Sequence, residues 1–263
     1  MSESRIIFED GAAYERMMGV WSRLVGEKFL DWLAPVANQH WIDVGCGNGA
    51  FTELLAQRCF PVEILGIDPS EHQLKFARSR CDVELVRFER GDASALPSED
   101  NHFDAAVMAL VIFFVPDPAQ GVAEMKRVVK AGGSISAYVW DVLEPGGFPM
   151  AAMQEELREM DFVPMLPPRA DVSRIDALHA LWENAGLIEV VSRPFVVTRS
   201  FNDFPDFWTT VEIALGMGQG TREMSGEARE RLRDRLQHRM PADASGRISF
   251  TSRANAVTGR VPI

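Results

Sequence analysis

Three alternate glycines follow a short apolar segment and carry the most specific chemical signal in this chain. Residues 41–44 have the pattern of a strand, Gly45, Gly47 and Gly49 form a turn, and a helical pattern begins near Ala50. Glycines at such a corner let the backbone turn tightly and bring its N–H groups against a ligand, beside a helix N-terminus that favours negative charge. The pattern predicts that the chain binds a nucleotide-like cofactor.

The glycine loop alone does not select one cofactor. Gly45-x-Gly47-x-x-Ala50 also fits the dinucleotide fingerprint G-x-G-x-x-G/A. Asp68 stands at the end of the second predicted strand, about twenty residues past the loop, where a carboxylate can accept hydrogen bonds from ribose hydroxyls. A nicotinamide dinucleotide and another adenosine ligand both fit these residues.

Two further carboxylates favour an adenosine ligand that also carries an amino group. Asp43 lies inside the first predicted strand, where a buried carboxylate is costly unless it meets a donor or a positive charge. Gly49 leaves room for a methionine-like tail. Asp92 closes the third predicted strand, where it could accept a hydrogen bond from the exocyclic amine of adenine.

Taken together, these segments resemble class I S-adenosyl-L-methionine (SAM)-dependent methyltransferases, especially their type 11 group, which includes quinone-biosynthesis and natural-product enzymes. The resemblance covers about residues 36–141 and is carried by residues 43–49, 66–70, 91–97, 103–106, 117–118 and 128–133. A weaker likeness extends to residues 14–22 and to the carboxy-terminal strands. The resemblance implies SAM as the cofactor, S-adenosyl-L-homocysteine as its product, and methyl transfer as the reaction.

The resemblance also implies roles for individual residues. Asp43 would face the methionine amino end, Asp68 would bind the ribose hydroxyls, and Asp92 would hold the adenine edge. Tyr14 and Trp21, on an amino-terminal helix, would cover the cofactor. The full set of expected cofactor-binding residues is Tyr14, Trp21, Asp43, Gly45, Cys46, Gly47, Gly49, Asp68, Pro69, Ser70, Asp92, Ala93, Ala109 and Leu110.

Strand and helix patterns alternate over about a hundred residues, which predicts an α/β fold with a parallel, doubly wound sheet. The resemblance implies a Rossmann-like sheet of seven strands, one of them antiparallel, with helical cap insertions and an amino-terminal helix. We expect a helical cover over residues 1–35 and a SAM-binding core over residues 36–141. Residues 142–263 would add substrate-cap insertions and the last strands of the same domain.

Several boundaries follow from local patterns. Ser70 is a candidate N-cap for a helix that begins at Glu71, and Val83 to Phe88 is a third strand candidate. A helix that begins at Pro118 is expected to stop at Gly132 and Gly133. Beyond the core, the remaining expected elements are a short helix at 150–160, a helix at 173–185, strands at 187–197 and 248–261, and a helical insert at 204–240.

Apolar residues beyond the core strands indicate a small, apolar or aromatic methyl acceptor, because ligand sites are mostly apolar with few polar anchors. The residues expected to contact the substrate are Phe113, Trp140, Phe148, Met165 and Trp208.

Methyl transfer from a sulfonium is an in-line displacement, so alignment and exclusion of water can supply much of the catalysis. An oxygen or nitrogen acceptor can still require a base. None of the five histidines is well placed, and Phe113 occupies the position after the fourth strand where related sequences often carry a histidine. Tyr14 and Asp141 are weak candidate bases. An acceptor that is already nucleophilic is the other possibility.

Two alternative functions stay open. The missing histidine and the large insertions are compatible with a SAM-binding protein that does not methylate, either as a partner subunit or with an altered activity. A nicotinamide-dependent oxidoreductase fits the G-x-G-x-x-A match, but the chain offers no hydride-transfer Tyr-Lys or His-Asp pair.

Composition narrows the partners. The formal net charge is −11, from 27 basic and 38 acidic residues, which argues against nucleic acid. The three cysteines show no C-x-x-C spacing, so neither a disulfide framework nor a metal site is expected. Without a signal-peptide pattern or an apolar run of roughly 20 residues, we expect a cytoplasmic protein that is a monomer or homodimer and does not associate with membranes.

Overall fold

One seven-stranded sheet organises the molecule, with the strand order β3-β2-β1-β4-β5-β7-β6. The computed structural model describes residues 15–81, 83–163 and 166–263. The strands are β1 (His40–Val44), β2 (Glu63–Asp68), β3 (Val86–Arg90), β4 (Phe103–Ala109), β5 (Val129–Trp140), β6 (Ile188–Phe201) and β7 (Ile248–Arg260). β7 is antiparallel to both of its neighbours, and the other neighbouring pairs are parallel. The predicted α/β fold with one antiparallel strand is confirmed.

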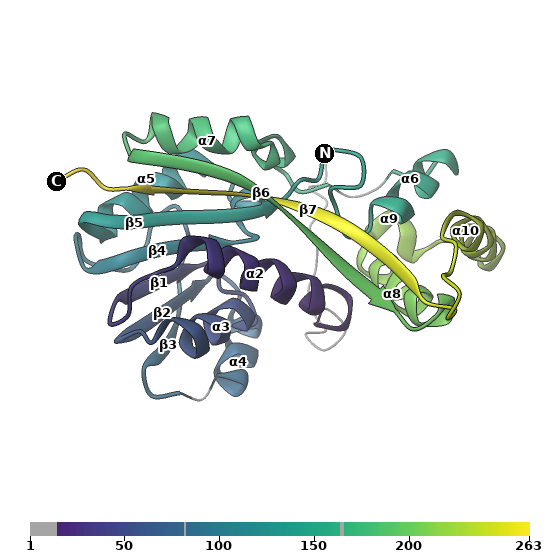
Figure 1. The fold of residues 1–263 in the computed structure, drawn as a ribbon, viewed down its shortest axis with the longest axis horizontal. Helices are drawn as coiled ribbons and strands as arrows, with labels where there is room; N and C mark the ends of the chain where they lie inside the picture. Colours follow the sequence, from purple (N-terminus) through teal and green to yellow (C-terminus); the bar gives the residue numbers. More distant parts are fainter. Residues whose placement is uncertain (1–14, 82, 164–165) are drawn as a thin grey trace.

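Helices cover both faces of this sheet. Those on one face are α2 (Val20–Leu33), α3 (Ala50–Cys59) and α4 (Glu71–Arg80), and those on the other are α5 (Pro118–Val128) and α7 (Ile175–Asn184) (Figure 1). The other helical elements are α6 (Ala151–Glu159), α8 (Phe204–Met217), α9 (Gln219–Arg222), α10 (Gly226–Arg239), the short 3₁₀ turns η2 (Ile112–Phe114) and η3 (Ala170–Ser173), and the π-helical turn η1 (Glu15–Gly19).

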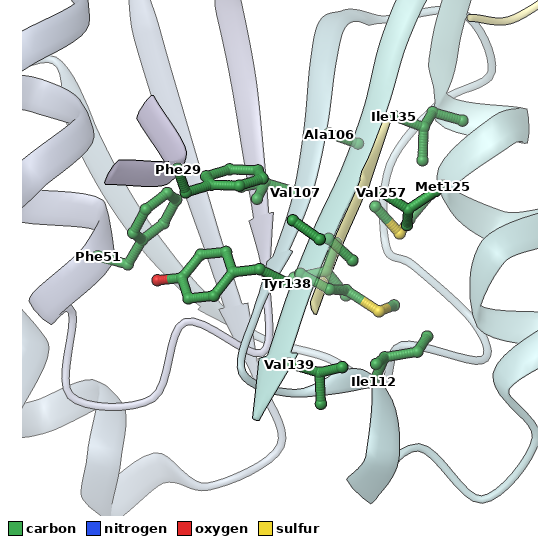
Figure 2. Packing of buried hydrophobic residues seen from close by; sticks show 14 of the residues in the cluster. Phe29, Phe51, Ala106, Val107, Ile112, Met125, Ile135, Tyr138, Val139 and Val257 are labelled. Atoms are coloured by element: carbon green, nitrogen blue, oxygen red, sulfur yellow. The ribbon is translucent and has the colours of Figure 1, made fainter. Parts of the chain in front are cut away.

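The main hydrophobic core lies on both sides of β5. Tyr138 points toward Phe29 of α2 and Phe51 of α3, while Met125 and Ile112 lie on the opposite side of the strand (Figure 2). The rings of Phe29 and Tyr138 have centroids 4.7 Å apart. Burial of these large apolar side chains stabilises the fold, and it fixes the strand ends that carry the site.

A second hydrophobic cluster lies beyond the end of β5. β5 pairs with β7 only from Ala254 to Arg260, whereas β6 and β7 continue together to Phe201 and Ile248. This long pair reaches α6, α8 and α10 (Figure 1), and the buried residues there include Met150, Met153, Leu157, Phe201, Phe207, Trp208, Leu232, Leu236 and Ile248. Phe148 and Phe250 contact both clusters, so the two cores are continuous.

Local signals set several element starts as predicted. Ser70 caps α4 by accepting a hydrogen bond from the N–H of Gln73, which confirms the expected N-cap. The amino-terminal helix is also confirmed, although its first turn, η1, is π-helical. Asp117 accepts hydrogen bonds from two backbone N–H groups at the start of α5, as side chains at N-cap positions do.

Some predicted boundaries are wrong. Gly132 and Gly133 do not end a helix, because α5 stops at Val128 and both glycines lie within β5. The pairing of β4 with β5 shifts register at this point, and a side chain at Gly133 would place its Cβ 2.7 Å from the carbonyl oxygen of Asp104. The glycine is therefore required by a close strand approach. β3 also begins later than expected, at Val86, and β6 extends beyond residue 197 because β7 continues to pair with it.

Within the described ranges, every helix is too short or too polar to cross a bilayer.

Asp104 joins three strands at the amino end of the sheet. Its carboxylate accepts hydrogen bonds from the backbone N–H of His40 (2.8 Å) and from Lys130 Nζ (2.6 Å). Burial alone would raise the pKa of Asp104, but these hydrogen bonds outweigh it and lower the pKa to about 2. The carboxylate therefore stabilises the fold above the unfolded-state pKa, and this contribution is lost as the pH falls from about 4 to about 2.

We expect Asp104→Asn to lower the free energy of unfolding at pH 7 by about 1 kcal/mol, a value reduced for solvent screening of a partly exposed group. Urea unfolding at pH 7 and at pH 3 measures the effect, which should shrink at the lower pH. Asp234→Asn, an exposed position on α10, is the matched control. Equal losses in the two variants at pH 7 would contradict the interpretation.

Candidate functional site

The glycine loop between β1 and α3 has the backbone geometry that its sequence predicts. Gly45, Gly47 and Gly49 have φ angles of 78°, 53° and 77°, in the left-handed region that favours glycine. A Cβ at Gly45 would lie 2.4 Å from the side chain of Val111, whereas a Cβ at Gly47 would meet no atom of the described residues within 4 Å. The loop is therefore tightly packed on one side and open at Gly47, where a ligand can approach the backbone.

Asp43 is a fully buried carboxylate at the base of this loop. Its Oδ2 accepts a hydrogen bond from Thr52 Oγ1 at 2.6 Å, while its Oδ1 is buried and finds no hydrogen-bond partner within residues 15–81, 83–163 and 166–263. Burial raises the pKa of Asp43 to about 7, the Thr52 hydrogen bond opposes the rise, and the charge of Asp68 adds to it. An oxygen in this state fits a cationic or hydrogen-bond-donating group of a ligand.

Asp68 connects the end of β2 to the loop. Its two oxygens accept hydrogen bonds from the backbone N–H groups of Gly47 (3.0 Å) and Ser70 (2.8 Å). Burial raises the pKa of Asp68, and both hydrogen bonds oppose that rise. Each carboxylate oxygen has a second lone pair, so the side chain can shape the loop and still accept hydrogen bonds from ribose hydroxyls.

The other expected cofactor contacts lie at the ends of the neighbouring strands. Asp92 follows β3, is exposed, and accepts a hydrogen bond from the N–H of Ser94 at 2.8 Å. Leu110 follows β4 with a φ of 62° and donates its N–H to the carbonyl of Tyr138. The structure thus gathers residues 43–49, 68–70, 92–93 and 109–111 at the carboxyl edge of the sheet, where open α/β sheets bind ligands.

Trp21 and Trp140 lie farther along this edge and are both buried. Their rings meet edge to face with centroids 6.3 Å apart. Tyr14 and Met165, expected to contact the cofactor and the substrate respectively, lie outside the described residues.

The other expected substrate residues are divided between the two hydrophobic clusters. Phe113 is buried in the main core, and its carbonyl accepts a hydrogen bond from the N–H of Arg169. Trp208 is buried in the second cluster, stacked on Phe204. Phe148 contacts both clusters. The fold does not bring these residues together in one layer, because β6 and β7 carry the second cluster beyond the sheet.

Asp141, a candidate base, is tied into the structure. Its Oδ2 accepts hydrogen bonds from Arg253 Nε at 3.1 Å and Asn255 Nδ2 at 2.9 Å, while its Oδ1 is buried without a partner. These donors hold the side chain against β7, so its contacts are structural. The base role of Asp141 remains a prediction.

Sequence reasoning missed a polar network on the outer side of the loop. Glu15 of η1 forms a salt bridge with Arg80 at 2.8 Å and accepts a hydrogen bond from Asn48 Nδ2 at 3.3 Å. Asn48 in turn accepts a hydrogen bond from the N–H of Ala50, the first residue of α3. The only sequence signal was a polar amide between two loop glycines. The network ties the amino-terminal helix to the glycine loop.

The sequence of this chain is similar to a known protein family and to curated relatives. Residues 42–137 match the family Methyltransf_11, described as "Methyltransferase domain". A demethylmenaquinone methyltransferase of Bacteroides fragilis is 33% identical over 130 residues, which cover 48% of this chain and 52% of that protein. The chain therefore spans about half the length of this curated relative.

Solved structures extend the likeness to most of the fold. A candidate methyltransferase from Bacillus halodurans superposes with a TM-score of 0.61 at 19% identity, covering 90% of this chain and 99% of that one. Phosphoethanolamine N-methyltransferase 2 of Haemonchus contortus, solved with SAM, superposes with a TM-score of 0.58 at 18% identity and covers 95% of this chain and 56% of that one. At these identities the likeness establishes the shared fold.

The strand order and the glycine loop, with acidic residues at the ends of β1 and β2, agree with the match of residues 42–137 to a class I SAM-dependent methyltransferase domain. Within this class, residues 42–137 are a methyltransferase domain of the type 11 group. SAM, the cofactor expected from the sequence motifs, is the cofactor of this class.

We expect Asp43→Asn to stabilise the ligand-free protein above pH 7 and to weaken cofactor binding. Because the pKa of Asp43 is raised, its ionisation removes stability as the pH rises from about 4 to about 7. The variant escapes this cost and should gain on the order of 2 kcal/mol at pH 8 in urea unfolding. Thr52→Val, which removes the donor to Asp43, should lose stability under the same conditions. A less stable Asp43→Asn protein at pH 8 would refute the argument.

Glu15→Gln tests the network on the loop. Loss of the carboxylate frees Asn48 and Arg80, and we expect the affinity for S-adenosylhomocysteine, measured by calorimetry, to fall about three- to tenfold. Glu71→Gln, which breaks the exposed pair with Arg78 on α4, is the matched control and should bind as the wild type does. Equal affinities for Glu15→Gln and wild type would rule out the coupling.

Proposed function

We propose that this chain is a SAM-dependent methyltransferase that acts on a small, apolar or aromatic molecule. The observation that carries the proposal is the unpartnered Oδ1 of Asp43 beneath a loop that is open at Gly47. A methionine amino group would place a positive charge beside a carboxylate that burial has made costly to ionise. A pyrophosphate would instead add negative charge close to Asp43 and Asp68.

The remaining residues would hold the cofactor as the family resemblance implies. The backbone at Gly45, Gly47 and Gly49 would border the methionine and ribose portions. Asp68 would accept the ribose hydroxyls, and Asp92 with Ala93 would hold the adenine. When bound, SAM supplies an activated methyl group on its sulfonium. Ala109 and Leu110, at the end of β4, would lie beside that group.

The methyl acceptor would lie between the carboxyl edge of the sheet and the second cluster. Trp140 ends β5 at this edge, and Phe148 contacts both clusters. Both relatives named above act, by their names, on small molecules: a demethylmenaquinone and phosphoethanolamine. The buried aromatic residues of this chain favour the aromatic type. Alignment and exclusion of water would then carry much of the reaction.

Three consecutive regions of the chain would have different roles. Residues 1–35 would form the amino-terminal cover, residues 36–141 the cofactor-binding core, and residues 142–263 the substrate cap together with the last strands. The continuity of the two hydrophobic clusters through Phe148 and Phe250 supports a single folding unit.

Calorimetry with SAM and S-adenosylhomocysteine tests the proposal directly. We expect both to bind, and Asp68→Asn to weaken binding by about 10- to 100-fold, because it removes a charged acceptor from the loop and the ribose site. Asp234→Asn is the surface control, and circular dichroism verifies folding. Failure of both ligands to bind the wild type at millimolar concentration would end the proposal. Mass spectrometry of a phenol and quinol panel incubated with SAM then distinguishes methyl transfer from binding alone.

A further inference from the structure

Three buried polar groups that have no hydrogen-bond partner among the described residues share one face of the sheet near its carboxyl edge. They are the indole Nε1 of Trp21, the indole Nε1 of Trp140 and the hydroxyl of Ser252. Each side chain is at most 2% exposed. A buried donor that lacks an acceptor costs about 1–3 kcal/mol, so a group of three in one region requires an explanation.

The strand register places these groups on the α2 face. Trp140 is the last residue of β5 and pairs with Ala254 of β7. Ser252 lies two residues away on β7, and side chains two apart on a strand point to the same face. Trp21 of α2 packs edge to face against both Trp140 and Phe250, with centroids 6.3 and 6.2 Å apart. The three groups therefore come from three elements and lie on one face.

This region adjoins the predicted position of the transferable methyl group. Ala109, the last residue of β4, pairs with Tyr138, and Trp140 lies two residues farther along β5 on the same face. The next residue in the chain, Leu110, donates its N–H to the carbonyl of Tyr138. The unpartnered donors thus begin where the expected cofactor contacts of β4 end.

The hydrogen-bonding groups of Trp21, Trp140 and Ser252 favour an oxygen atom of a ligand. Indole N–H groups only donate hydrogen bonds. The neighbouring cation, Arg199 of β6, already donates to the carbonyls of Arg16 and Met17. Asp141 follows Trp140, so its side chain points to the opposite face of the strand; its Oδ2 accepts from Arg253 and Asn255, and its Oδ1 has no partner among the described residues. A donor-rich, buried site stabilises an anionic or carbonyl oxygen and disfavours an ammonium group.

We propose that Trp21, Trp140 and Ser252 bind the oxygen of a phenol- or enol-type methyl acceptor and stabilise it as an oxyanion. This inference rests on the proposed function. It also replaces the role of the missing histidine, because hydrogen bonds from two N–H donors and the Ser252 hydroxyl would stabilise the ionised oxygen against the cost of its burial. The acceptor then releases its proton to solvent on binding and needs no base beside it.

The probe for this site is 4-nitrophenol, whose ionisation is visible by absorbance. Its pKa is measured in the complex of the protein with S-adenosylhomocysteine, for the wild type and for Trp21→Phe, Trp140→Phe and Ser252→Ala. Each Trp→Phe change removes one N–H and keeps an aromatic ring. Trp41→Phe is the matched control, because Trp41 is also buried with an unpartnered Nε1 but lies near the start of β1.

We expect the wild type to lower the pKa of bound 4-nitrophenol by about one unit. Trp21→Phe and Trp140→Phe should each weaken phenolate binding about fivefold, and Trp41→Phe should leave it unchanged. Circular dichroism and urea unfolding verify that each variant folds. An unshifted pKa, no saturable absorbance change, or an equal effect of Trp41→Phe would each overturn the inference.

The same experiment separates this inference from the proposed function. If S-adenosylhomocysteine does not bind, the cofactor assignment fails, and the titration is repeated on the protein alone. A shift that still depends on Trp21 and Trp140 would then preserve the oxygen site without the methyltransferase. Normal cofactor binding with no such shift would preserve the proposed function and remove the oxygen site.

Discussion

The burial of the Asp43 carboxylate is the constraint on which the arrangement of the site depends. Burial raises its pKa to about 7, and only Thr52 among the described residues donates a side-chain hydrogen bond to it. The N–H groups of Gly45 and Cys46 in the adjacent loop do not donate to this carboxylate, because both already donate to the carbonyl of Ile67. The packed sheet thus holds this carboxylate in a position set by β1, where a cationic ligand would offset the cost of burying its charge.

The side of the molecule proposed to hold the acceptor depends on a different constraint, the length of the β6–β7 pair. These strands continue beyond β5 and carry a second hydrophobic cluster past the sheet edge. Arg199, on this extension, donates to the carbonyls of Arg16 and Met17 in η1. The amino-terminal turn is therefore held between the extended strands and, through Glu15, the glycine loop. These contacts connect the glycine loop to the β6–β7 extension.

Much of the fold and the cofactor loop could be predicted because those features are local. A backbone with positive φ at Gly47 favours glycine, and an N-cap at Ser70 favours a short hydroxyl side chain. The prediction that Gly132 and Gly133 end a helix is wrong, because both glycines lie within β5. Gly133 serves a close approach to Asp104 of β4, and a contact with a residue so far away in the chain leaves no mark in the local pattern.

The sequence by itself determined the class of domain, its cofactor loop and the carboxylates that surround it. Each of these depends on residue type within a few positions of the backbone it shapes. Only the tertiary structure decided which polar groups have partners. Trp182 and Trp140 are both buried, yet Trp182 donates its N–H to the carbonyl of Ile135 and Trp140 finds no acceptor in the part of the chain that the structure describes. That difference arises from packing between distant elements, because a hydrogen bond forms only where the fold brings donor and acceptor within reach.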